Sequence, residues 1–183
     1  MTAAVARDGA GQQALMAGDR AAARSAFAAA AELYCQSWEV APASAYGRLV
    51  GMLKSSVLAG GGVVEARYAL DALVDADPES STASYARALA ALILDDDEDA
   101  RVWAAHMGMG PDAFGRTAQA IAALAERDQA GYAAALHAIV HDFEQRAEHL
   151  TGVAIADTAL VLSELGARRG MAVAVESPVF PAL

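Results

Sequence analysis

One short phrase, Ala-Leu-x3-Asp, occurs three times along this chain and predicts how the chain is divided. The copies are Ala14-Leu15-x3-Asp19, Ala91-Leu92-x3-Asp96 and Ala123-Leu124-x3-Asp128. Apolar residues at helical spacing precede each copy, and a second such stretch follows it. Asp is a favourable N-cap, because its carboxylate accepts hydrogen bonds from the free backbone N–H groups at the start of a helix. Each copy therefore predicts the end of one helix and the start of the next.

Short helices joined by tight breaks are typical of stacked helical hairpins, and such stacks mostly bind other molecules. Alanine, the best helix former, is the commonest residue of the chain. The length of 183 residues is that of one domain with a single core. We therefore expect an all-α fold of stacked antiparallel helical hairpins, an irregular tetratricopeptide-like bundle, in one domain over residues 1–183.

The breaks in apolar periodicity predict nine helices and an extended tail. The first four are expected at 3–17, at 20–40, between a cap at Ser44 and the glycines 60–62, and at 63–76 with Val74 facing inward. The next three are opened by Pro78, placed at 97–107, and started by Pro111. The eighth is capped by Asp128 and buries residues as far as Ala147, and the ninth covers 155–168. Residues 171–176 alternate Ala and Val, so we expect a short extended C-terminal tail along the helices or paired with another chain.

Charge and composition exclude several classes of protein. A net charge of −10 at pH 7 argues against nucleic-acid binding, which needs clustered Lys and Arg, and favours a basic protein partner. The absence of an 18-residue apolar run argues against a membrane span. The single cysteine, Cys35, cannot form an internal disulfide, and the N-terminus lacks the layout of a signal peptide. We therefore expect a cytoplasmic protein.

A group of His and Glu residues marks one possible site in the eighth expected helix. His137, His141, Glu144 and Glu148 fall within about 60° of arc at roughly 100° per residue. Imidazole and carboxylate on one face can bind zinc or perform acid–base catalysis, for which His137, His141 and Glu144 are the candidates. Ala138 occupies the position of the catalytic Glu in the zinc-protease helix motif. A polar flank with ordinary i, i+4 contacts is therefore favoured, and neither a metal nor another cofactor is expected.

The densest charge run is a second candidate site. It consists of Asp95, Asp96, Asp97, Glu98 and Asp99. Acidic groups at a helix start are stabilised by capping and by the helix dipole, which accounts for about three of the five. The excess can present an anionic patch to a basic partner, although most charge runs are only solvated.

Aromatic residues and glycines give weaker signals. Trp38, Trp103, Tyr34 and Tyr46 can line a ligand groove, but aromatics at helical spacing more often pack in a core. The glycines at 60–62 follow no strand and lack the Lys and Ser/Thr of a phosphate loop. Cys35 is interpreted as a small buried apolar group.

Two resemblances to known families add to these observations. Gly11-x2-Ala14-Leu15-x2-Gly18-Asp19-x3-Ala23-x3-Phe27 resembles half of a tetratricopeptide repeat, in which small residues let paired helices cross closely. Residues 114–183 resemble the immunity protein 49 family, found beside bacterial polymorphic toxins. That resemblance is carried by Arg127-Asp128-x3-Tyr132-x3-Leu136, Leu165-x3-Arg169-Gly170 and Val175-x-Ser177-Pro178-x2-Pro181.

The resemblance implies a helical cytoplasmic protein that binds and neutralises a cognate toxin without catalysis. It transfers no functional residue to this chain. The leading hypothesis is therefore an interaction protein of the immunity type with a basic toxin as partner. The alternatives are a cofactor-free enzyme or small-molecule binder of a biosynthetic pathway, with an internal cavity lined by Trp, Tyr and His, and a generic helical scaffold or dimerisation module.

Overall fold

A computed structural model describes residues 1–110 and 112–181, and within these ranges the chain forms nine helices and no strand. The helices are α1 (Thr2–Met16), α2 (Arg20–Glu39), α3 (Gly47–Leu58), α4 (Val63–Ala72), α5 (Ser81–Ile93), α6 (Asp97–Met107), α7 (Asp112–Ala125), α8 (Gln129–Glu144) and α9 (Asp157–Arg168). The all-α prediction is confirmed. None of the described helices is long and apolar enough to cross a bilayer.

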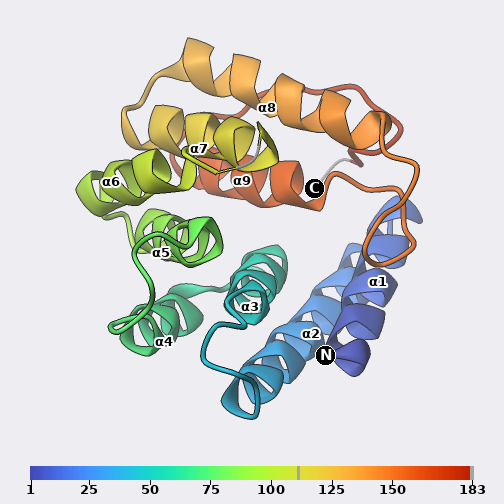
Figure 1. Ribbon diagram of the computed structural model, residues 1–183. Helices are drawn as coiled ribbons and strands as arrows, with labels where there is room; N and C mark the ends of the chain where they lie inside the picture. Colours follow the sequence, from blue (N-terminus) through green and yellow to red (C-terminus); the bar gives the residue numbers. More distant parts are fainter. Residues whose placement is uncertain (111, 182–183) are drawn as a thin grey trace.

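Each helix from α1 to α8 packs on the next one, as expected of a stack of helical hairpins (Figure 1). The last helix breaks this order. After α8, a loop over residues 145–156 runs beside α1 and returns, and α9 then packs on α3 and α7 as well as on α8. Helix α9, near the C-terminus, is thereby packed against α3, which belongs to the first half of the chain.

The three Ala-Leu-x3-Asp phrases form the same helix–turn–helix geometry. The residue before each Asp has a left-handed φ, which is 77° for Gly18, 60° for Asp95 and 59° for Arg127. The amide of each Asp donates to the carbonyl of the phrase's Ala, with N···O distances of 2.9, 3.0 and 2.9 Å. The carboxylates of Asp19, Asp96 and Asp128 then cap α2, α6 and α8. The predicted turn is confirmed at all three places.

Removing one of these caps tests their contribution. The Asp128 carboxylate accepts from the amides of Ala130 (3.1 Å) and Gly131 (3.0 Å). Asp128→Ala is expected to lower the free energy of unfolding by about 1 kcal/mol, because two amides at the start of α8 lose their partner. Urea denaturation measures the change. Asp128→Asn is the control, since Asn caps about as well, and an equal loss in both variants would contradict a capping role.

Several predicted boundaries are wrong because loops replace the expected helical ends. α4 stops at Ala72, so Val74 is outside the helix and 74% exposed instead of inward. Ser80 caps α5 through its hydroxyl, two residues after Pro78, so Pro78 lies in the preceding turn and does not open the helix.

Three further boundaries concern α3, α7 and α8. α3 follows Tyr46, so Ser44 does not cap it. The predicted start of α7 at Pro111 lies outside the described residues. α8 ends at Glu144, and Ala147 is exposed in the following loop. The helical periodicity that placed Ala147 inward no longer applies there.

Close helix crossings rely on glycine facing an aromatic ring. A Cβ added at Gly11 would lie 2.8 Å from the ring of Phe27, and one added at Gly51 would lie 2.7 Å from the ring of Tyr34. Both rings are almost fully buried. Glycine at these positions lets α2 approach α1 on one side and α3 on the other, and the α1–α2 crossing is the one predicted from the tetratricopeptide-like phrase.

The tail after α9 runs along α8. The Gln129 amide, at the start of α8, donates to the Ala172 carbonyl (3.3 Å), and the Ser177 hydroxyl donates to Glu144 at its end (2.6 Å). Residues 171–176 have no regular secondary structure, and Ser177 and Phe180 form an isolated antiparallel bridge. Val179 and Phe180 are buried, so the tail contributes to the core.

Candidate functional site

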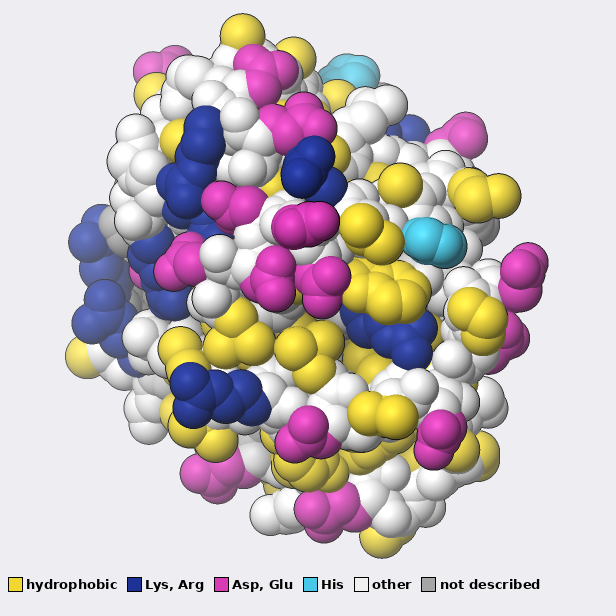
Figure 2. All heavy atoms as spheres, turned by 90° about the vertical axis from the view of Figure 1, so that its left-hand side faces the viewer, with side chains coloured by type: hydrophobic (Ala, Val, Ile, Leu, Met, Phe, Trp, Pro, Cys, Tyr) yellow, Lys and Arg dark blue, Asp and Glu magenta, His cyan; other side chains and the backbone are white. Residues whose placement is uncertain are grey.

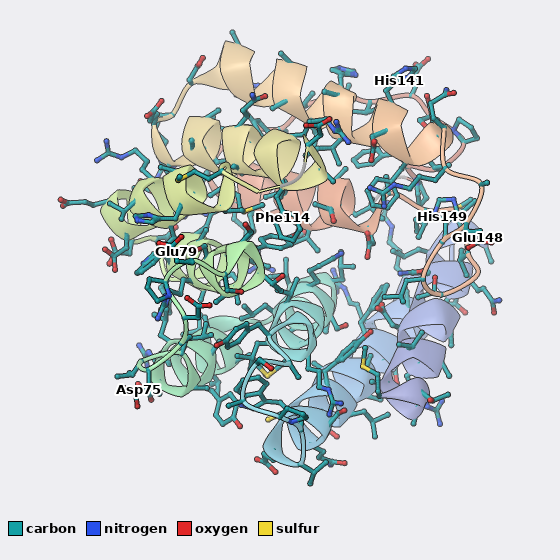
Figure 3. The ribbon with its side chains drawn as sticks, viewed as in Figure 1. Asp75, Glu79, Phe114, His141, Glu148 and His149 are labelled. Carbon is teal, nitrogen blue, oxygen red and sulfur yellow. The ribbon has the colours of Figure 1, made fainter. Side chains whose placement is uncertain are left out.

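A polar pocket of about 250 Å³ lies where the first and second halves of the chain meet. Side chains from seven helices and from the 145–156 loop line it. Phe114 of α7 points toward the middle of the molecule, and Glu148 and His149 of the loop lie beside α1 (Figure 3). Because the pocket is built from elements distant in sequence, its shape depends on the complete fold.

The only lysine of the chain, Lys54 of α3, lies at the inner end of this pocket. Its ammonium donates to the Asp157 carboxylate (2.5 Å) and to the Thr158 hydroxyl (3.1 Å), both at the start of α9. Burial alone would lower the pKa of Lys54, but the charges of Asp157 and Asp8 and the nearby Tyr85 raise it above its usual value. Lys54 is therefore a cation at neutral pH and is not available as a nucleophilic amine.

A second carboxylate, that of Asp8 in α1, approaches the same cation from behind the pocket. Asp8 is 9% exposed and accepts a hydrogen bond from the Tyr34 hydroxyl at 3.3 Å. Burial raises the pKa of Asp8 to about 6, opposed by Lys54 and Tyr34 and reinforced by Asp157. Burial and the adjacent Asp8 also raise the pKa of Tyr34, so its phenol stays protonated and remains a donor. Asp8, Tyr34, Lys54 and Asp157 form one buried polar network across α1, α2, α3 and α9.

The raised pKa of Asp8 predicts a pH-dependent stability. Between about pH 4 and 6 the folded protein keeps a proton on Asp8 that the unfolded chain has lost, so this contribution to the free energy of unfolding disappears as pH rises through 6. Asp8→Asn is expected to stabilise the protein by about 1–3 kcal/mol at pH 8 and to have little effect at pH 4.

Urea denaturation of both proteins across pH 4–8 measures the difference. Asn at position 8 can still accept from Tyr34, so the comparison isolates the charge. Asp19→Asn on the exposed cap of α2 is the control, and a stability gain in Asp8→Asn that does not change with pH would contradict the assignment.

The Tyr85 hydroxyl, on α5, faces the same inner end of the pocket. Tyr85 is 8% exposed, and its hydroxyl makes no hydrogen bond among the described residues. Burial raises its pKa, as does the charge of Asp157, against the opposing effect of Lys54. On another wall, the Thr151 hydroxyl of the loop bonds to the Gln12 side chain of α1. The Thr158 hydroxyl lies near that of Tyr85 and lowers its pKa, so both hydroxyls face a polar group that enters the pocket.

The outer part of the pocket contains a shared ion pair. Asp142 of α8 accepts from Arg116 of α7 (2.5 Å) and from Arg146 of the loop (2.6 Å). The Arg146 guanidinium also lies over the ring of Phe143, 3.7 Å from its centre, and His149 lies 6.1 Å from the same ring. Apolar rings and paired charges together suit an amphipathic group with a polar end.

The His and Glu residues predicted as a metal or acid–base site do not come together. His137 and His141 are exposed on α8, and His141 contacts only Glu144 among the group, at 3.5 Å. Glu148 lies beyond the end of α8, in the loop next to α1 and away from His141 (Figure 3). Placing Glu148 on the helical face was wrong. Within residues 1–110 and 112–181, no group of three or more His, Cys, Asp and Glu can hold a metal.

Three residues of the acidic run 95–99 make contacts within the protein. Asp96 caps α6, and Asp95 and Asp97 lie 2.7 and 3.5 Å from the buried guanidinium of Arg169 after α9. Asp97 also pairs with Arg127 at 3.2 Å. On the side of the molecule that carries α4–α6, several acidic side chains lie close together, with basic and hydrophobic ones beside them (Figure 2). Asp95, Asp96, Glu98 and Asp99 are nevertheless exposed, so the binding of a basic partner at this run stays a prediction.

The aromatic residues Trp38, Trp103, Tyr34 and Tyr46 pack against other side chains, as the interpretation that they belong to the core predicts. Tyr34 and Tyr46 are buried, and Trp38 is half-buried with its ring 6.1 Å from that of Tyr46. Trp103 lies over the Arg87 guanidinium at 4.3 Å. None of these four lines the polar pocket.

The pocket residues that matter most were missed in the sequence. Lys54 and Asp157 are 103 positions apart, and no local motif connects them. One signal was present: Lys54 is the only lysine and follows Leu53 in an apolar helical stripe, where a cation needs a partner.

Comparison of the chain with protein-family models, with curated proteins and with solved structures finds no match.

Proposed function

We propose that this chain is a cytoplasmic, non-catalytic protein of the immunity type, which neutralises a cognate toxin by binding it. The observation that carries the proposal is the polar pocket, in which the one amine is kept as a cation and Asp142 and Asp157 are paired with basic groups. Such a site recognises a polar group without activating it. A side chain of the partner with an apolar stem and a polar end fits the pocket's rings and its Tyr85 hydroxyl.

The segment that resembles the immunity protein 49 family also supports this proposal, because its motif residues have structural roles. The Tyr132 hydroxyl donates to the Leu162 carbonyl (2.9 Å), and its ring covers Gly166 of α9. Arg169 contacts the Leu92 carbonyl at the end of α5. Residues with these roles hold α9 in place. The less regular 145–156 loop and the pocket that it lines are then the parts whose sequence can vary with the binding partner.

Growth rescue tests the proposal. The genes next to this one are sequenced first, and a toxic domain encoded there is expressed in a bacterial host with and without the chain. Wild-type protein is expected to restore growth and to bind the purified toxin domain in calorimetry.

Charge reversal at the pocket gives a matched comparison. Arg146→Glu is expected to weaken binding at least tenfold, whereas Arg101→Glu, an exposed residue of α6 outside the pocket, is expected to leave it unchanged. If the neighbouring toxin neither binds nor loses toxicity, the immunity proposal is wrong. Equal losses of affinity in both variants would indicate that the partner binds somewhere other than the pocket.

The second candidate function is small-molecule binding, which the same pocket favours through its volume of about 250 Å³. A metabolite library tested by thermal shift distinguishes the two. A ligand that stabilises wild-type protein and not Tyr85→Phe, together with failure of growth rescue, would support this candidate.

A further inference from the structure

A second hollow, separate from the polar pocket, lies between α2 and α4 above α3. Both α2 and α4 pack on α3 (Figure 1), and a groove of about 560 Å³ remains between them. Its walls come from residues at helical spacing on α2 and α4, with Met52 and Ser56 of α3 at its floor. The α2 wall consists of Ala28, Ala31, Glu32, Cys35 and Gln36, and the α4 wall of Val64, Glu65 and Tyr68.

The groove is apolar along its length and open to solvent. Val64 is 74% exposed although it is a β-branched apolar residue on a helix. Ala28 presents only a methyl group to the groove, and Ala31 beside it is buried. The two walls come close at one point, where partial burial and the neighbouring Cys35 thiol raise the pKa of Tyr68 to about 12. An exposed apolar side chain on one wall and a small residue on the other give a surface on which an amphipathic helix can pack.

The charges at the groove have one sign. Glu32 lies on one wall and Glu65 on the other, and no Lys or Arg is among the described residues that line it. Arg24 on α2 and Arg67 on α4 are exposed on the same two helices but are not among the residues that line the groove. With a net charge of −10 for the chain, this surface repels acidic partners and attracts basic ones.

We infer that the α2–α4 groove binds a basic amphipathic helix of a partner protein, with the apolar face of that helix on Ala28 and Val64 and its Lys or Arg residues near Glu32 and Glu65. The inference does not depend on the partner being a toxin, and it concerns a surface separate from the polar pocket.

Cys35, the only cysteine, makes the groove directly measurable. Two synthetic 18-residue peptides serve as probes. They share leucines at helical spacing, with lysine at the polar positions of one and glutamate at those of the other. The lysine peptide is expected to bind saturably, measured by fluorescence anisotropy, and to slow the reaction of Cys35 with a thiol reagent about tenfold. The glutamate peptide is expected to do neither.

Charge-reversed variants test whether the groove is responsible. Glu32→Lys combined with Glu65→Lys is expected to weaken lysine-peptide binding at least tenfold. Glu126→Lys combined with Glu176→Lys makes the same change in net charge at exposed positions outside the groove and is expected to leave binding unchanged.

Three results would overturn the inference. They are equal losses in both double variants, unaltered Cys35 reactivity when the lysine peptide is bound, and Cys35 protection that rises with protein concentration alone. The last would assign the groove to a second copy of this chain. Thermal unfolding of each variant confirms that the fold is intact, and the outcome is independent of growth rescue.

Discussion

Leu136→Asp is expected to abolish stable folding, with a loss of about 5 kcal/mol or more in the free energy of unfolding. Leu136 lies at the middle of α8 with 0% of its surface exposed. The substitution removes a large apolar side chain from the core and places an unpaired carboxylate there, and each change alone costs several kcal/mol. Circular dichroism during thermal unfolding gives the measurement.

The matched control is Ala134→Asp, which introduces the same residue on the exposed face of the same helix. Its melting temperature is expected to stay within a few degrees of wild type, since exposed substitutions usually change stability by less than about 0.5 kcal/mol. Similar melting temperatures for the two variants would show that the faces of α8 are assigned wrongly.

Asp157→Asn is expected to cost about 3–5 kcal/mol, because it leaves the Lys54 cation without its closest partner in a largely buried site. The opposite sign is expected for Asp8→Asn, although both variants remove one carboxylate from the same network. The difference arises because Asp157 bonds directly to Lys54, whereas burial destabilises the charged form of Asp8 by more than Lys54 and Tyr34 stabilise it.

Urea denaturation at pH 8 compares the two variants and the double variant. We expect non-additive effects, because each carboxylate alters the charge that the other experiences. Loss of stability in both single variants would show that Lys54 needs both carboxylates, and would contradict the raised pKa of Asp8.

The sequence predicted those parts of the fold that depend on local chemistry. The three Asp caps were predicted because capping and the turn before it involve residues a few positions apart. The bounds of α6, at Asp97 and Met107, follow from such a cap at one end and from Gly108 at the other. Leu136, Leu162 and Leu165 were placed correctly by helical periodicity and are buried.

The failures begin where helical periodicity ends. Val74 and Ala147 were assigned inward positions on helices that stop before reaching them, and Glu148 was assigned to a helical face for the same reason. Periodicity also says which side of a helix faces inward but not which helix lies opposite. The Lys54–Asp157 pair and the pocket around it both depend on the packing of α9 against α3. Neither could therefore be predicted from periodicity.

The return of α9 also changes how the chain should unfold. In a simple array of hairpins each unit touches only its neighbours, so terminal units can separate while the remainder persists. Here Arg168 bonds to carbonyls at the end of α3, and Arg169 to a carbonyl at the end of α5. Contacts between residues about a hundred positions apart raise the contact order, which slows folding and couples the two ends of the chain. The protein is expected to lose its structure in one cooperative step, and shortened forms that lack α9 are expected to lose stability throughout the stack.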